Sequence, residues 1–176
     1  VIVPFWTNFL VRTYAWMFIL RTEGLLSTIL LKLGVIASPI EILYSDAAVL
    51  IGLVYGYLPF MVLPLYANLE KHDPALLDAA QDLGANAWQR FWRVTFPLSL
   101  PGVYAGAALV FIPALGIFAI PDLLGGTEGI MIGNVIKQQF LDTRDWPFGS
   151  ALSMVLTAMA VGLAGLAAWV ARRSRT

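Results

Sequence analysis

The chain has no cysteine, only one histidine and no Gly-Lys pair in its 176 residues. Without cysteine, disulfides and thiolate metal sites are excluded. The missing Gly-Lys pair excludes a phosphate-binding P-loop, so any ATP hydrolysis would take place on another chain. The single histidine, His72, lies in a loop where we predict that it is solvated, which leaves imidazole catalysis and metal binding inside an apolar core without a candidate. The sequence therefore predicts a protein that is not an enzyme and that binds no metal or cofactor.

Charge is also scarce: charged residues make up 12% of the chain, against about 25% in soluble proteins. The net charge of zero argues against a nucleic-acid partner. Hydrophobic residues make up 59% and the mean hydropathy is +0.77. Uncharged runs at 47–69, 94–121 and 146–171 each exceed the roughly 20 residues that a helix needs to cross a bilayer. A soluble helical core would need polar helix faces, which these runs lack. We therefore predict an all-α membrane protein.

The sequence predicts one transmembrane domain, 1–176, with four spans at about 1–20, 47–69, 97–121 and 146–171. The chain begins without methionine inside an apolar stretch, and we interpret it as a fragment that lacks amino-terminal spans. Positive residues set the orientation. The loop between the second and third spans holds three positive residues (Lys71, Arg90 and Arg93), and the carboxyl tail holds three more (Arg172, Arg173 and Arg175). The first outer loop holds only Arg21 and Lys32, and the second outer loop only Lys137 and Arg144. This modest excess places the loop between the second and third spans and the carboxyl terminus in the cytoplasm.

The cytoplasmic loop contains a predicted helical hairpin at 73–95. Asp73 is a good N-cap, and Gly84 is a natural left-handed terminator for the first helix. Asn86 caps a second helix, with Gln89 in the capping-box position. A polar, well-capped element between two apolar spans indicates a docking surface for a soluble partner.

The first hairpin helix has a distinctive face. Asp78 and Asp82 lie one turn apart and make it acidic, while Ala79 and Ala80 allow close approach by a partner. The second helix carries tryptophans and is predicted to stop before Pro97. The alternative is a solvated loop helix whose tryptophans sit at the membrane interface.

Glycines and prolines gather in the second and third spans, where they favour close helix packing and bends. This pattern is typical of a moving pathway or of ordinary bundle packing. Outside the spans, residues 24–34 form a short amphipathic segment that we place along the outer interface. The second outer loop, from Pro121 to Trp146, is either a gate or docking rim, or a solvated connector.

The hairpin sequence resembles a known motif. Asp78-Ala79-Ala80, then Gly84, then Val94-Thr95-Phe96-Pro97, is similar to the "EAA" motif of permease subunits of bacterial ABC importers, with Asp78 in place of the usual Glu. Further segments resemble the spermidine/putrescine permease branch of that family: 4–8, 12–16, 111–116, 121–126 and 144–149.

The resemblance implies a type I importer transmembrane domain in the bacterial inner membrane, of which this chain would be the last four of about six helices. It implies that the hairpin is a coupling helix that contacts a cytoplasmic ABC ATPase dimer, through Asp78, Ala79, Ala80, Asp82, Gly84 and Pro97. The other implied partners are a second, homologous permease subunit and a periplasmic substrate-binding protein.

The same resemblance implies polyamine transport. Ferric iron or an organic acid is an alternative solute, and a passive channel is a more remote alternative function. The path of a flexible polycation should offer carboxylates and aromatic faces. Our candidates are Trp6, Tyr14, Trp16 and Asp122, although the aromatic residues are equally consistent with interfacial packing. Arg12 lies among them and should repel a polycation unless it reaches the interface or pairs with a carboxylate.

Overall fold

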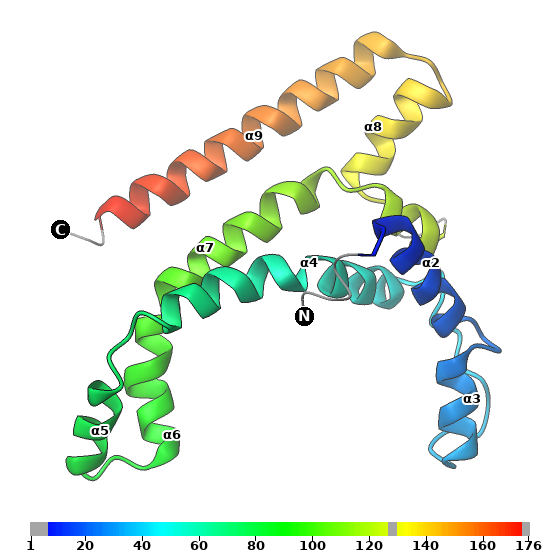
Figure 1. Ribbon diagram of the computed structural model, residues 1–176. Helices are drawn as coiled ribbons and strands as arrows, with labels where there is room; N and C mark the ends of the chain where they lie inside the picture. The colour runs from blue at the N-terminus through cyan, green and yellow to red at the C-terminus, as the bar shows by residue number, and fades with distance from the viewer. Residues whose placement is uncertain (1–6, 127–129, 174–176) are drawn as a thin grey trace. The chain divides into compact units, whose positions relative to one another are not determined.

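The computed structural model describes residues 7–126 and 130–173. All the regular structure in these ranges is helical (Figure 1). The helices, with η for π-helical turns, are α2 (Phe9–Leu20), α3 (Leu25–Lys32), α4 (Asp46–Leu69), α5 (Ala75–Asp82), α6 (Ala87–Arg90), η1 (Phe91–Thr95), α7 (Phe96–Leu115), η2 (Pro121–Gly125), α8 (Ile132–Leu141) and α9 (Trp146–Arg173).

Four segments in the described ranges are long and apolar enough to cross a membrane. They are Phe9–Lys32, which contains α2, a short turn and α3, then Asp46–Leu69, Ala87–Leu115 and Trp146–Gly165. Large apolar side chains along them are exposed, such as Phe18 (63%) and Met154 (74%). Exposed apolar surface of this extent is typical of helices that face lipid or another subunit.

The third of these segments differs from the sequence-based prediction at both ends. The hairpin's second helix does not stop before Pro97; it continues through η1 into α7. The N–H of Phe96 bonds to the carbonyl of Phe91, five residues earlier, and this wider turn accommodates the following proline, which has no N–H to donate. At the other end α7 finishes at Leu115, so the residues up to 121 do not prolong it.

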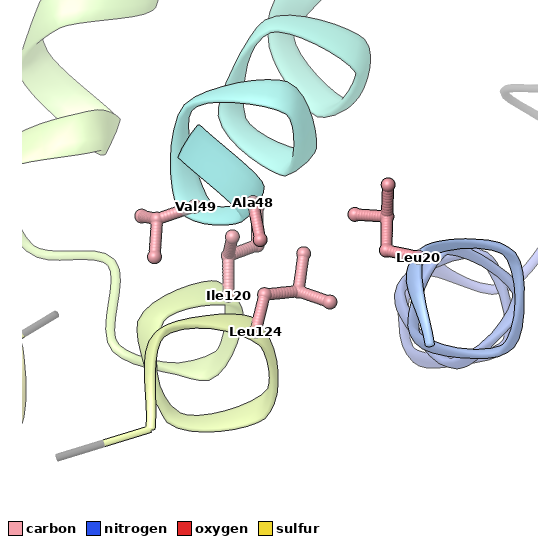
Figure 2. Close-up of a cluster of buried hydrophobic side chains, with 5 residues drawn as sticks. All are labelled: Leu20, Ala48, Val49, Ile120 and Leu124. Carbon is pink, nitrogen blue, oxygen red and sulfur yellow. The ribbon is translucent and has the colours of Figure 1, made fainter. Parts of the chain in front are cut away.

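The chain divides into two units, and each is described by itself. The first comprises residues 1–58 and 113–163 and contains a small apolar core. Figure 2 shows Ile120 and Leu124, from the segment around η2, packed against the start of α4 and the end of α2; the five core residues are Leu20, Ala48, Val49, Ile120 and Leu124. Gly52 of α4 permits this approach, since a Cβ there would lie 2.6 Å from the Cδ1 of Leu124.

The second unit comprises residues 59–112 and 164–176 and contains the hairpin. The later part of α4 packs closely against the early part of α7. A Cβ on Gly102 would meet the Cβ of Asn68 at 2.8 Å, and one on Gly106 would meet the Met61 carbonyl oxygen at 3.0 Å. The predicted role of these glycines in close helix packing is therefore confirmed at this crossing.

Candidate coupling hairpin and substrate path

Helix α5 has the caps that the sequence predicts. The Oδ1 of Asp73 accepts a 2.9 Å hydrogen bond from the N–H of Ala75. At the other end Gly84 adopts a φ of +82°, and its N–H bonds to the carbonyl of Gln81. The N–H of Ala85 bonds to the carbonyl of Ala80, which completes a Schellman termination.

Helix α6 begins with the predicted capping box. The Oδ1 of Asn86 accepts from the N–H of Gln89, and the Oε1 of Gln89 accepts from the N–H of Asn86. One side-chain bond then joins the two helices: Arg90 Nη1 donates to Gln81 Oε1 at 2.7 Å. The hairpin is thus closed by its own hydrogen bonds. Its helices α5 and α6 lie side by side (Figure 1).

Five of the six predicted coupling residues lie on this hairpin. Asp78, Ala79 and Asp82 are exposed and Ala80 is half-buried. Leu83, at the end of α5, is 88% exposed. Acidic and apolar side chains are therefore exposed together on this hairpin. Pro97 lies outside it, within α7.

The base of the hairpin is joined by polar contacts that the sequence analysis missed. The carbonyl of Leu98 accepts from Asn68 Nδ2 at 2.8 Å and lies 2.9 Å from His72 Nε2. The prediction that His72 is a solvated loop residue is therefore wrong: its ring is half-buried and hydrogen-bonded to α7. No sequence pattern predicts this contact, because it depends on where α4 and α7 cross.

Four aromatic rings pack along the second helix. Trp92 lies at the centre, with ring centroids 5.7 Å from Trp88, 5.3 Å from Phe91 and 5.1 Å from Phe96. All four side chains remain substantially exposed. Rings with this exposure are typical of a membrane interface, where one edge is apolar and the other is wet.

The candidates for the substrate path are only partly brought together. Arg12 and Trp16 line one small cavity of about 10 Å³, with room for about one water. Trp16 also stacks edge-on against Tyr55, with centroids 5.3 Å apart. Tyr14 is exposed and does not line this cavity. Trp6 lies outside the described residues.

Asp122 lies elsewhere in the first unit and already has a cationic partner. It is the second residue of the π-helical turn η2, and its carboxylate accepts from Lys137 Nζ and from Asn134 Nδ2. The hydrogen bond with Asp122 raises the pKa of Lys137 above its usual value, so this ammonium stays charged throughout the physiological range.

The partners of Asp122 come from α8, a helix that the sequence analysis missed in the second outer loop. The spacing of Ile132, Val135, Ile136 and Phe140 is a helical pattern that could have revealed it. The helix approaches the end of α7 closely, since a Cβ on Gly133 would lie 2.6 Å from the carbonyl oxygen of Gly116.

A cavity of about 430 Å³ lies beside α8. It is lined by Gly116, Phe118, Gly133, Ile136, Lys137, Phe140, Leu141, Ser153, Leu156 and Thr157. Within the described ranges, no group of three or more His, Asp or Glu residues could hold a metal ion.

Comparison with known proteins identifies the class of protein. The family model for the inner membrane component of binding-protein-dependent transport systems matches residues 2–176. The chain belongs to this family, and the resemblance read from the hairpin motif is confirmed.

Among curated relatives, the chain is 54% identical to the spermidine/putrescine transport system permease protein PotB of Escherichia coli K12, over 98% of this chain and 62% of that protein. It is equally 54% identical to the PotB of Haemophilus influenzae, over 90% of this chain and 56% of that protein. The E. coli inner membrane ABC transporter permease protein YdcU is 33% identical, over 88% and 53%. The chain thus spans little more than half the length of these relatives.

A solved structure shows the same fold. A bacterial ABC transporter involved in the import of the acidic polysaccharide alginate matches with a TM-score of 0.71 and 18% identity, over 97% of this chain and 63% of that one. This match and the helical structure of the described residues confirm the predicted fold class, an all-α importer permease domain.

Proposed function

We propose that this chain is part of a permease subunit of an ATP-binding-cassette importer, and that its solute is a polyamine such as spermidine or putrescine. The relatives named for spermidine/putrescine transport are 54% identical over most of the chain and support this solute. The observation that carries the proposal is the hairpin of α5 and α6, a self-closed element with an exposed acidic and apolar face.

In the proposed mechanism the hairpin is the element through which the ATPase moves the transmembrane helices; we call it the lever. Its caps and the Arg90–Gln81 bond keep it folded without a partner, so it presents a fixed surface for docking. A cytoplasmic ATPase dimer grips this surface through Asp78, Ala79, Ala80, Asp82 and Gly84. The shorter side chain of Asp78, where the family motif has Glu, brings its carboxylate closer to the backbone of α5. Pro97 acts further along, where α7 leaves the π-helical turn.

ATP is hydrolysed by the partner, because this chain contributes no P-loop. A periplasmic binding protein delivers solute to the outer loops of this subunit and of a second, homologous permease. In this arrangement the hairpin and the carboxyl terminus face the cytoplasm, in accord with the excess of Lys and Arg there. Closure of the ATPase dimer shifts the equilibrium between outward and inward states only through contacts that differ between them.

Uptake of labelled spermidine and putrescine by proteoliposomes that contain the full complex tests the proposal. We expect uptake that requires both ATP and the binding protein. Uptake without ATP would instead identify a passive channel. Competition by ferric iron or by an organic acid, with no competition by putrescine, would reassign the solute and leave the class of transporter unchanged.

Two variants test the lever itself. We expect Asp78→Lys and Gly84→Pro to insert into the membrane normally but to uncouple ATP hydrolysis from uptake. The first reverses the charge of the docking face, and the second fixes φ near −65° where +82° is required. Uptake per ATP hydrolysed at the parent level in both variants would contradict the coupling role.

A further inference from the structure

The ammonium group of Lys137 occupies a site built from three kinds of group. It donates to the Oδ2 of Asp122 and lies 5.7 Å from the centroid of the Phe118 ring. The amide of Asn134 donates to the other carboxylate oxygen, Oδ1. A carboxylate together with an aromatic face is the environment that a primary ammonium group prefers.

The carboxylate is held in place without help from Lys137. The Oδ1 of Asn134 accepts from the N–H of Met131, and its Nδ2 donates to the carbonyl of Phe118, both at 3.1 Å. These backbone contacts fix the amide, and the amide in turn positions Asp122. Asp122 is also anchored by its own N–H, which bonds to the same Phe118 carbonyl at 3.0 Å.

The ion pair is open to exchange. The side chains of Lys137 and Asp122 are 34% and 31% exposed, and ion pairs of this exposure contribute little net stability because water competes for both partners. Phe118 and Lys137 also line the cavity of about 430 Å³ beside α8. A displaced lysine side chain therefore has space into which it can move.

We infer that Asp122, Asn134 and Phe118 form a binding site for a primary ammonium group of the solute, and that Lys137 is a tethered competitor that fills this site when no solute is present. The inference rests on the proposed function, since a polyamine supplies the required ammonium ends. An arriving ammonium displaces an equivalent one, so the charge at the site is unchanged by the exchange. The competing explanation is a purely structural brace between η2 and α8.

The test measures equilibrium binding of labelled spermidine to the assembled complex in lipid nanodiscs, without the binding protein. We expect Lys137→Met to bind spermidine roughly tenfold more tightly than the parent, because the internal competitor is gone, and Asp122→Asn to bind it roughly tenfold more weakly. In the Asp122→Asn background, Lys137→Met should give no gain. This non-additivity identifies a shared site.

Two controls separate the site from general electrostatics. Lys32→Met removes the same charge from an exposed lysine of α3 and should leave spermidine affinity at the parent value. N,N′-Diacetylputrescine, which has no ammonium group, should bind neither the parent nor the Lys137→Met complex.

Distinct results would overturn the inference. Unchanged affinity in both single variants, with a lowered unfolding temperature, would establish the brace. If Lys32→Met raised the affinity for spermidine as much as Lys137→Met does, the gain would come from the change in net charge and not from a shared site. ATP-dependent uptake of spermidine by the parent, together with either result, would overturn this inference alone, whereas a parent complex that takes up no spermidine would overturn the proposed function as well.

Discussion

The side chain of Asn68, at the end of α4, donates a 2.8 Å hydrogen bond to the backbone carbonyl of Leu98 in α7. His72, four residues further on, reaches the same carbonyl oxygen. The two residues span the point where the chain leaves α4 for the hairpin and where it returns into α7. One carbonyl group therefore fixes the base on which the hairpin stands.

The first prediction concerns this base. We expect Asn68→Leu and His72→Ala each to lower the free energy of unfolding by about 1 kcal/mol, the typical net value of a hydrogen bond. The double variant should lose more than the sum, because the Leu98 carbonyl then has neither side-chain partner. Thermal unfolding of the solubilised complex measures the loss. Lys71→Ala, in the same loop, is the control and should leave stability unchanged; an equal loss there would show that the loop is generally sensitive.

The second prediction uses the left-handed conformation of Gly84. A Cβ there meets no atom within 4 Å, so a substitution is penalised by the backbone alone. We expect Gly84→Asn to retain more coupling than Gly84→Ala, because Asn tolerates the left-handed region at lower cost, and Ala should lose about 1 kcal/mol of hairpin stability. ATP hydrolysed per solute transported gives the order. A more severe defect in Asn than in Ala would indicate a steric role at the docked surface.

The third prediction addresses the crossing of α4 and α7. Gly102→Ala would place its Cβ 2.8 Å from the Cβ of Asn68, so the helices must separate and about 1–3 kcal/mol of stability should be lost. Gly162→Ala is the matched control, since that glycine is helical, exposed and has nothing within 4 Å. It should be neutral or stabilising by up to about 1 kcal/mol. Unfolding temperatures that fall equally in the two variants would contradict the close packing.

The fourth prediction concerns the close contact between α8 and the backbone that follows α7. A Cβ on Gly133 would meet the carbonyl oxygens of Ile117 and Gly116 at 2.5 and 2.6 Å, and these are backbone atoms that no side-chain rotation can move. At Gly52 the nearest atoms are instead side-chain ends of Leu124 and Ile120. We therefore expect Gly133→Ala to lower the unfolding temperature more than Gly52→Ala does. The reverse order would show that the core around Leu124 is the less adaptable of the two.

The fifth prediction concerns pH. The hydrogen bond to Asp122 raises the pKa of Lys137 above 10.5, so its contribution is fully present below the unfolded value and is lost only as pH rises through the folded value. The effect of Lys137→Met on the unfolding temperature should accordingly be the same at pH 6 and pH 8. If Lys137→Met changed the unfolding temperature by different amounts at pH 6 and pH 8, another titrating group would control the contact.

Local chemistry made part of the molecule predictable from sequence. The caps at Asp73, Gly84, Asn86 and Gln89 depend on residues within a few positions of one another, and each was predicted correctly. The hairpin motif likewise sufficed to identify the family. Hydrogen bonds between residues close in sequence, and a compact sequence motif, can be predicted because they do not depend on the packing around them.

Features that depend on distant partners were missed. The contact of His72 with Leu98 and the pairing of Asp122 with Lys137 join residues 26 and 15 positions apart. The continuation of the helix through Pro97 depends on a π-helical turn, which has no sequence signal comparable to a cap. Proline was read as a stop because it removes a hydrogen bond, whereas the preceding wide turn had already shifted the bonding register.

The uninterrupted helix from Ala87 to Leu115 has a mechanical consequence. Its backbone stays helical from α6 through η1 into α7, and the wide turn at Phe91–Thr95 with Pro97 beside it is the kind of place where a helix bends. In the proposed mechanism, a displacement of the hairpin reaches the close contact at Gly102 and Gly106 through this helical backbone. The π-helical turn is then the place where such a displacement changes direction before it reaches the contact between α4 and α7.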